Sequence, residues 1–300
     1  MKRLGWSAAI VAAACGAGGR ATPFDGQAAL RYVEEQVAFG PRVPNTEAHR
    51  RAGDWIQAHL ARTADSVEVQ AFTHVTADGD TLHLRNFIGR FRPEARERVL
   101  LLAHWDSRPR ADQSANLGEQ QVPVPGANDG ASGVAVLLGV ADVLAKTPPS
   151  VGVDLLFVDG EDYGVFSSLD GGIGPDVLLG SRHYAAGLAE ADFPLYAVLF
   201  DMVGDADLQI FQEGHSLARA PEVVARVWSV AEELGYGDVF QSSSRYTLTD
   251  DHVPLLDRGV RAIDVIDYDY PPWHTLADTP DKVSARSLQI VGDVAVALVE

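Results

Sequence analysis

The residues of this chain that are best suited to chemistry are histidines and carboxylates that follow apolar, strand-like runs. They are His104, Asp129, the adjacent pair Glu161 and Asp162, Asp201 and His274. The carboxyl ends of the strands in an open α/β sheet meet at one edge, which is where such sheets bind ligands. Imidazoles and carboxylates gathered there are typical zinc ligands, and a further carboxylate can act as a general base. The set therefore predicts a zinc site with a general base beside it.

Two motifs place a carboxylate close to the predicted metal. In HWDS, Asp106 stands two residues after His104, so in an extended chain it can accept the second ring N–H and orient His104 as a ligand. The glycine-rich stretch GANDGASG (126–133) presents Asp129 on a tight turn before a helical segment. A phosphate-binding turn is disfavoured, because Asp129 would repel an anion and no Lys-Ser or Lys-Thr pair follows. A plain Asn-Asp-Gly turn is the alternative interpretation.

The other motifs supply the base and the second imidazole. Glu161 and Asp162 follow a buried run directly, and adjacent carboxylates point in different directions. One can therefore bind the metal while the other faces the substrate and titrates separately. Asp201 follows the next buried run, and His274 follows the last one across a short loop. A solvated acidic pair is the alternative for Glu161 and Asp162, but their position at a strand end disfavours it.

The elements that must position these residues are those of an α/β sheet. Continuous apolar runs predict interior strands over Arg98–Ala103, Val153–Val158, Tyr196–Phe200 and Arg261–Ile266. Alternating segments around Asp78-Gly79 predict an antiparallel edge hairpin over Val67–Val75 and Thr81–Arg92. Helical spacing recurs over Ala28–Phe39, Glu47–Arg62, Ser132–Lys146, Pro221–Leu234 and Ser284–Val299. We expect a single α/β domain with a mostly parallel, twisted central sheet flanked by helices on both faces.

The first residues predict export. Two basic residues precede an apolar stretch that is too short to span a bilayer, and Cys15 follows small residues as in the lipobox of bacterial lipoproteins. We expect a signal peptide over 1–14, a short linker over 15–27 that starts at Cys15, and a catalytic domain over 28–300. The protein would then be a membrane-anchored lipoprotein or, with a plain secretory signal, periplasmic or extracellular. An uncleaved leader is the remaining alternative.

Composition narrows the classes of function. Cys15 is the only cysteine of the 300-residue chain, so a metal site in the globular part must use histidines and carboxylates. The formal charge of −18 repels nucleic acid and anionic lipid, which excludes nucleic-acid binding and leaves a lipid anchor as the expected membrane contact. Such a charge ordinarily serves solubility, but it could also attract the α-ammonium group of a peptide.

A series of motifs resembles the M28 zinc aminopeptidase superfamily, and within it the glutaminyl cyclases (glutaminyl-peptide cyclotransferases) most closely. In order, the motifs are HWDS, GANDGASG, DGED, LLGSRH (178–183), FDMVGD, DDHVPLL (250–256) and WHT. The resemblance extends from about Ala28 to the end of the chain and implies a zinc-exopeptidase-like fold. The chain departs from the cyclases in having Asp162 where Glu is common, and Asp264 near where animal cyclases have His.

By position, the resemblance implies a role for each site residue. The implied zinc ligands are Asp129, Asp162 and His274, joined by His104 and Asp201 if a second zinc is bound, with Asp129 then bridging. The implied catalytic residues are Glu161 as general base, Asp201 and Asp250 beside it, and Asp106 orienting a ligand. The substrate pocket is expected to include Trp273 and Trp105. The family also has an unusual cis peptide after the residue that matches Asp129.

The same residues can serve two reactions on peptide or protein N-termini. In a cyclase, which is an aminoacyltransferase, zinc polarises the γ-carbonyl of an N-terminal Gln, and Glu161 passes a proton from the α-amine to departing ammonia. In a two-zinc aminopeptidase, Glu161 and the metals activate water, and the N-terminal residue is hydrolysed off. We favour the cyclase, with the aminopeptidase as the alternative. A non-catalytic, peptide-binding surface lipoprotein is a third hypothesis, disfavoured because the base and all candidate ligands are present.

Overall fold

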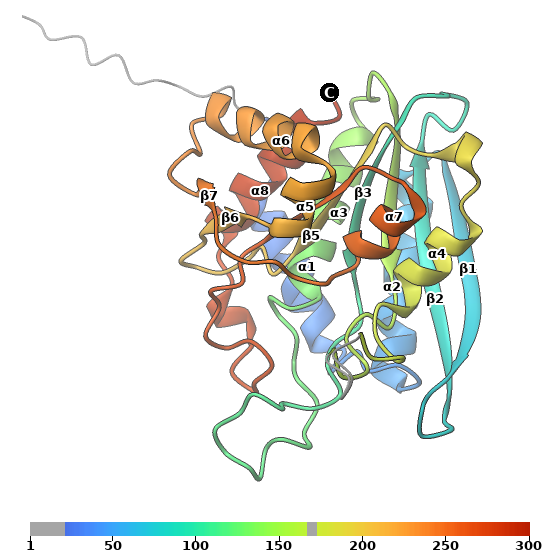
Figure 1. The fold of residues 1–300 in the computed structure, drawn as a ribbon, viewed down its shortest axis with the longest axis vertical. Coiled ribbons are helices and arrows are strands. Elements are labelled where there is room, and N and C mark those ends of the chain that lie inside the picture. Colours follow the sequence, from blue (N-terminus) through green and yellow to red (C-terminus); the bar gives the residue numbers. More distant parts are fainter. Residues whose placement is uncertain (1–21, 167–172) are drawn as a thin grey trace, which may run out of the picture.

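The central sheet combines an antiparallel edge with a parallel interior (Figure 1). Within residues 22–166 and 173–300, which the computed structural model describes, its six strands run in the order β1-β2-β4-β3-β5-β8. Their bounds in that order are Ser66–Val75, Thr81–Phe91, Gly152–Val158, Arg98–His104, Tyr196–Asp201 and Ala262–Ile266. The pairs β1–β2 and β2–β4 are antiparallel, whereas β3–β4, β3–β5 and β5–β8 are parallel. The predicted edge hairpin and parallel interior are confirmed.

The burial of each strand follows from its sequence. β5 and β8 are buried at every residue, because YAVLFD and AIDVI are apolar on both faces apart from one Asp each. β1 largely alternates exposed and half-buried residues, as SVEVQAFTHV alternates polar and apolar ones, and it lies at the edge of the sheet. Since β4, β3, β5 and β8 are parallel, their carboxyl ends meet at one edge, where the predicted ligands follow.

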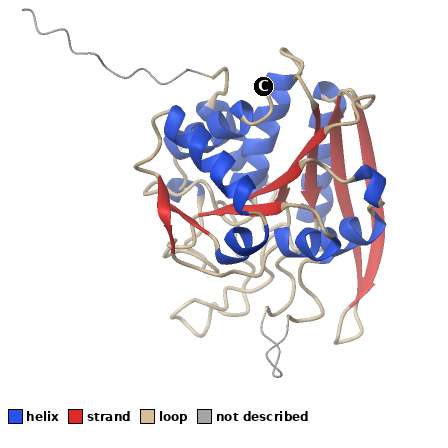
Figure 2. Cartoon of the chain, turned by 45° about the horizontal axis from the view of Figure 1, so that its top comes forward, coloured by secondary structure: helices blue, strands red, loops and turns tan. Residues whose placement is uncertain are grey.

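Helices cover both faces of the sheet (Figure 2). The predicted helices are observed as α1 (Gly26–Ala38), α2 (Glu47–Thr63), α3 (Ala131–Leu144), α6 (Pro221–Glu233) and α8 (Ala285–Ala297). α1, α2, α3 and α8 pack together on one face, while α4 (Leu179–Gly187) and α7 (His252–Arg258) pack together on the other. The sheet is thus the middle layer of an α/β domain, as expected from the sequence.

Several short elements were not predicted. They are α4, α5 (Gly214–Arg219), α7, the 3₁₀ turns at Glu190–Asp192 and Pro280–Lys282, and the strands β6 (Ile210–Gln212) and β7 (Phe240–Ser244). β6 and β7 form a small parallel sheet of their own, and β6 packs against β8. Helices of six to nine residues such as α4, α5 and α7 contain too few turns to show a helical period in the sequence.

Helix α3 forms the centre of the core and begins at the predicted metal site. Every residue of α3 except Asp142 is buried, because the sequence is apolar on all sides. At Gly133 a Cβ atom would lie 2.1 Å from the backbone oxygen of Phe200, so only glycine allows α3 to lie directly on β5. The Asp129 turn therefore stands directly before a helix that packs closely on the sheet.

The packed domain reaches further toward the N-terminus than the expected boundary at residue 28. Phe24 is buried, and α1 already begins at Gly26, where the carboxylate of Asp25 accepts the N–H groups of Gln27 and Ala28. The expected signal peptide, Cys15 and most of the linker lie outside the described residues. Within the described part of the chain, no helix combines the length and the apolar character needed to cross a membrane.

Candidate active site

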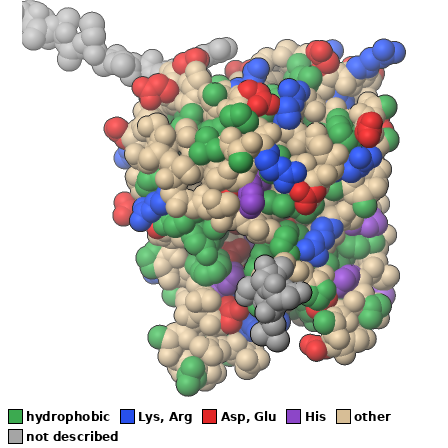
Figure 3. Space-filling model, in the orientation of Figure 1, with side chains coloured by type: hydrophobic (Ala, Val, Ile, Leu, Met, Phe, Trp, Pro, Cys, Tyr) green, Lys and Arg blue, Asp and Glu red, His purple; other side chains and the backbone are tan. Residues whose placement is uncertain are grey.

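The loops that follow the parallel strands enclose a pocket of about 390 Å³. Its lining includes Asp129, Glu161, Asp162, Asp201, Asp250, Trp273 and His274 from the predicted set. Figure 3 shows charged side chains of both signs spread over one face of the molecule, which is hollowed in its lower half. The structure thus brings together residues that lie far apart in the sequence, because their strands end at one edge.

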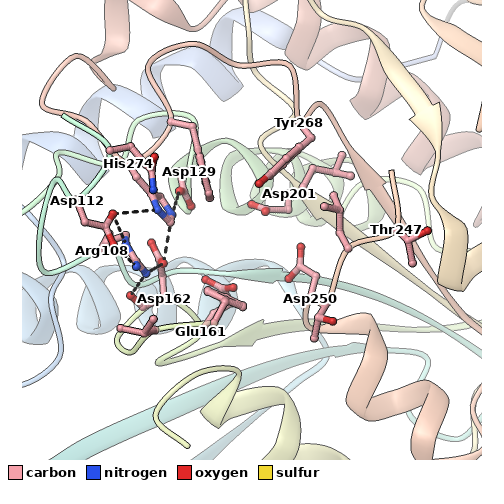
Figure 4. A pocket seen from close by; sticks show the side chains of 17 residues that line it. Arg108, Asp112, Asp129, Glu161, Asp162, Asp201, Thr247, Asp250, Tyr268 and His274 are labelled. Atoms are coloured by element: carbon pink, nitrogen blue, oxygen red, sulfur yellow. Dashed lines mark hydrogen bonds and ion pairs between the residues drawn. The ribbon is translucent and has the colours of Figure 1, made fainter. Parts of the chain in front are cut away.

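Three residues, here called the His274 cluster, form the first potential metal site (Figure 4). Ligand atoms of Asp129, Asp162 and His274 all lie within 4.8 Å of one another. His274 Nε2 is 3.5 Å from Asp129 Oδ2 and 3.4 Å from Asp162 Oδ1. The other ring nitrogen, Nδ1, lies 3.3 Å from Asp112 Oδ1. A histidine that ligates a metal usually gives its other N–H to such a carboxylate, so Asp112 directs Nε2 toward the cluster.

A buried arginine links Asp162 of the His274 cluster to Asp112, the carboxylate behind His274. Arg108 donates to Asp162 Oδ1 at 2.5 Å and to both carboxylate oxygens of Asp112, at 3.0 and 2.6 Å. Burial raises the pKa of Asp112, but the hydrogen bonds to His274 and Arg108 outweigh burial and hold it well below its ordinary value. Arg108 and Asp112 were missed by the sequence analysis.

The second potential metal site, here called the His104 cluster, shares Asp129 with the first. It comprises His104, Asp129 and Asp201, whose ligand atoms also lie within 4.8 Å of one another. His104 Nε2 is 3.0 Å from Asp201 Oδ1, with which it forms a hydrogen bond, and 3.2 Å from Asp129 Oδ1. Because Asp129 turns Oδ1 toward His104 and Oδ2 toward His274, it has the geometry of a bridging carboxylate.

The residues present fit a zinc ion. Asp162 Oδ2 is buried and has no hydrogen-bond partner, which would be costly unless a cation or water fills the space beside it. Burial raises the pKa of Asp162, but His274 and Arg108 outweigh burial and lower it, which keeps a charged carboxylate available. One imidazole and two carboxylates, with a position left for water or substrate, form a catalytic zinc set. Among the described residues, these two clusters are the groups of His and carboxylates able to hold a metal.

Glu161 has the environment of a general base. It is buried in the pocket wall, with Oε2 3.7 Å from His104 Nδ1. Burial raises its pKa well above the ordinary value, and the charges of Asp162 and Asp250 raise it further, against the opposing effect of His104. Figure 4 shows Glu161 between the His274 cluster and Asp250. A carboxyl group with a raised pKa can both accept and return a proton near neutral pH.

The structure changes the role expected of Asp106. Its Oδ1 lies 3.7 Å from His104 Nδ1, which is too far for a hydrogen bond. Instead its two oxygens accept the backbone N–H groups of Glu161 at 3.1 Å and Asp162 at 3.2 Å. Asp106 therefore orients the base and a candidate ligand through their backbone, rather than orienting His104 through its ring.

Asp250 and its neighbours add further buried carboxyl groups. Asp250 lines the pocket, and its Oδ1 accepts the N–H of Asp251 at 2.6 Å. Asp264, which stands near the position of a histidine in animal cyclases, is buried with no hydrogen-bond partner on either carboxyl oxygen. Burial, followed by the charges of Asp250 and Asp201, raises the pKa of Asp264 well above its ordinary value. The neighbouring carboxylates therefore disfavour the charged form of Asp264.

Two expectations are corrected. Trp105 does not line the pocket: it is fully buried in the core, stacked on His49 with ring centroids 4.3 Å apart, and its indole N–H donates to the backbone oxygen of Arg85. Successive side chains of an extended segment point to opposite sides, so Trp105 faces away from His104 and the pocket. The expected cis peptide after Asp129 is not found, as the described residues contain none, and Gly130 makes the turn with a φ of 93°.

Comparison with known proteins now identifies the family. Residues 86–299, more than half of the chain, match Peptidase family M28. The chain belongs to this family. Membership confirms the resemblance noted in the sequence, makes the protein an M28 enzyme, and implies zinc as the metal for its candidate clusters.

Relatives of this M28 enzyme include proteins of both expected activities. Aminopeptidase YwaD of Bacillus subtilis (strain 168) is 27% identical over 257 residues, which cover 78% of this chain and 46% of that protein. The chain thus spans less than half the length of that relative. Glutaminyl-peptide cyclotransferase of Bos taurus is 26% identical over 292 residues, covering 82% of this chain and 74% of that protein. Family membership therefore leaves both activities open.

A solved structure shows the same fold over almost the whole chain. It is the crystal structure of Bacteroides thetaiotaomicron glutaminyl cyclase bound to N-acetylhistamine, which is 35% identical to this M28 enzyme with a TM-score of 0.89. The alignment covers 93% of this chain and 99% of that one. The zinc-exopeptidase-like fold expected from the sequence is confirmed.

Proposed function

We propose that this M28 enzyme is a glutaminyl-peptide cyclotransferase with one zinc ion, which converts the N-terminal Gln of peptides to pyroglutamate and releases ammonia. The observation that carries the proposal is the difference between the two histidines. His274 is directed toward its cluster by Asp112, whereas His104 already hydrogen-bonds Asp201 through Nε2 and has no hydrogen-bond partner at Nδ1. One well-prepared metal site is the arrangement that the resemblance to the cyclases implies.

The proton transfers of the reaction fall to Glu161. Zinc bound at the His274 cluster would polarise the γ-carbonyl of the substrate glutamine. Glu161 accepts a proton from the α-amine, whose nitrogen then attacks the γ-carbonyl carbon and forms the ring C–N bond. The same carboxyl group returns the proton to the amide nitrogen, the bond from that nitrogen to the attacked carbonyl carbon breaks, and ammonia leaves. The raised pKa of Glu161 suits both transfers.

The pocket wall supplies shape and flanking acids. Trp273 stacks on His274 with ring centroids 3.9 Å apart and meets Tyr268 edge-on at 5.2 Å. These rings form an apolar side against which a short side chain can lie folded toward its own amine. Asp201 and Asp250 also line the pocket, with Asp201 beside Tyr268 (Figure 4), and can hold the amine end of the substrate.

The second candidate is an M28 aminopeptidase, and the His104 cluster favours it. His104, Asp129 and Asp201 provide a second ligand set, and Asp129 is oriented to bridge two ions. With both sites filled, Glu161 would take a proton from water, and that water would attack the peptide carbonyl. Occupancy of the His104 cluster therefore separates the two functions.

One experiment tests the proposal. The purified protein is loaded with zinc, its metal content is measured, and it is incubated in parallel with a peptide that begins with Gln and a matched peptide that begins with Leu. Release of ammonia from the Gln peptide without release of free Leu from the Leu peptide supports the cyclase. Free Leu together with two zinc ions per chain would overturn it in favour of the aminopeptidase.

We also propose export, on the pattern of the first residues alone. The mature protein would carry acylated Cys15 and place peptide turnover outside the cytoplasm. Mass spectrometry of the N-terminal peptide from the membrane fraction tests this, with Cys15→Ser as the matched variant. Recovery of unprocessed residues 1–14 would contradict it.

A further inference from the structure

Asp278 lies behind the His274 cluster and contacts the turn that carries Asp129. Its Oδ1 accepts the backbone N–H of Asn128 at 2.8 Å, and its Oδ2 accepts that of Asp129 at 3.2 Å. The hydroxyl of Tyr270 donates to the same Oδ1 at 2.7 Å. Asp278 is fully buried and does not line the pocket. One carboxylate therefore accepts hydrogen bonds from two successive backbone N–H groups, one of which belongs to the candidate ligand Asp129.

The same residue belongs to the loop that carries His274. The backbone N–H of Asp278 donates to Thr275 O at 3.3 Å, which closes a turn directly after His274. The backbone oxygen of Asp278 accepts the N–H of Ala127 at 3.4 Å, a further link to the Asp129 turn. His274 itself has a φ of 53°, a costly conformation that persists only where surrounding contacts impose it. The two ligand loops are thus joined at Asp278.

We propose that Asp278, held by Tyr270, is a positioning residue that fixes Asp129 at metal-binding distance from His274, an inference that rests on the zinc site of the proposed function. Both ligands stand on loops, and loops are free to separate unless something joins them. If the loops are ordered before the metal binds, the entropy lost in ordering them does not weaken metal binding. Partners outside the ligand set typically change metal affinity by about 10- to 100-fold.

The chain offers a matched pair elsewhere for comparison. Asp293 is also a buried aspartate that accepts a tyrosine hydroxyl, from Tyr236 at 2.5 Å, and it accepts the side-chain amide of Gln289 at 2.7 Å. It lies on α8, and neither Asp293 nor Tyr236 lines the pocket. Loss of either Tyr–Asp pair should affect folding stability in a similar way, but only the Tyr270–Asp278 pair should affect zinc.

The test measures zinc affinity without any substrate. Asp278→Asn and Tyr270→Phe are compared with Asp293→Asn and Tyr236→Phe in the full chain, by Zn²⁺ titration against a chromophoric chelator and by the visible absorption of the Co²⁺-loaded protein. We expect the zinc dissociation constant to rise by about 10- to 100-fold in Asp278→Asn. A smaller rise, of about threefold or more, is expected in Tyr270→Phe, which keeps the carboxylate. The Asp293 and Tyr236 variants should match the native chain.

The outcomes are distinct. A changed cobalt spectrum and weaker zinc binding in the Tyr270 and Asp278 variants alone support the positioning role. Equal zinc affinity in Tyr270→Phe and Tyr236→Phe overturns it, even if Asp278→Asn does not fold. Because no reaction is measured, the positioning role survives if the protein proves to be an aminopeptidase, and the cyclase proposal survives if Asp278 has no effect on zinc.

Discussion

The His274 and His104 clusters contain the same kinds of residue and share Asp129, yet their surroundings differ. In the His274 cluster, Asp112 holds the outer ring nitrogen of the histidine, Arg108 holds one oxygen of Asp162, and the other oxygen of Asp162 is left without a partner. In the His104 cluster, the ring nitrogen that faces the carboxylates already bonds Asp201. Since the two clusters have the same types of ligand, the contacts that support the ligands must decide which cluster is arranged for metal binding.

The clusters also differ in what lies beside them. Trp273 stacks on His274, so the His274 cluster shares a wall with the substrate pocket. His104 is buried between Asp106 and Glu161 and does not line the pocket. We infer that His274 acts on the substrate side of the site, and that His104 acts on Glu161.

The largest effect should separate the two histidines. His274→Ala should lower zinc affinity by more than about 100-fold, because loss of a ligand costs more than loss of a supporting group. His104→Ala should keep one zinc per chain. The measurement is the zinc content of each variant after dialysis. The unfolding midpoint of each variant checks that it is folded. Full zinc occupancy in His274→Ala, or equal loss in both variants, would show that the comparison is wrong.

Glu161→Gln should leave zinc in place and slow turnover by at least about 100-fold, because it removes the general base while keeping the size of the side chain. The measurement is kcat on a peptide that begins with Gln, at matched zinc content. Near-normal kcat would rule out Glu161 as the base.

The pH profile gives a smaller, independent signal from the same residue. Glu161 must be deprotonated to accept a proton, so kcat should fall as the pH drops through its pKa. Since burial raises that pKa, the acidic limb should lie above about 4.3, the value of an exposed Glu. Glu161→Gln should lose this limb. If the acidic limb of the pH profile stays at the same pH in Glu161→Gln, the limb belongs to another group.

The gathering of the site residues could be predicted from the sequence. Apolar runs ending in His104, Glu161 and Asp201 predicted parallel strands, and parallel strands end at one edge. The position of the pocket at that edge follows from this rule. Whether each residue binds metal or moves protons as the resemblance implies stays a prediction for the experiments above.

The supporting residues could not be predicted. Asp112, Arg108 and Asp278 lie on loops, whose sequences have no period and whose partners lie far along the chain. The expectation from the resemblance that Trp105 lines the pocket is wrong. The alternation that puts His104 and Asp106 on one side of the chain puts Trp105 on the other, so its position away from the pocket could be predicted.

The smallest expected effect on zinc affinity is that of replacing Asp112, the carboxylate that supports His274. Asp112→Asn keeps an oxygen that can accept the His274 Nδ1–H, but it loses the charge that Arg108 and His274 share. Zinc affinity should fall by about tenfold, at the lower end for a supporting group. The matched variant is Asp142→Asn, since Asp142 also accepts from a histidine, His59 Nε2 at 2.9 Å, away from the pocket.

Zinc competition titrations on both variants give the answer. A fall in Asp112→Asn alone means that the carboxylate behind His274 prepares that cluster for metal. Unchanged affinity in Asp112→Asn would mean that His274 needs no such support. The difference between the two clusters would then rest on His104, whose Nε2 is already bonded to Asp201.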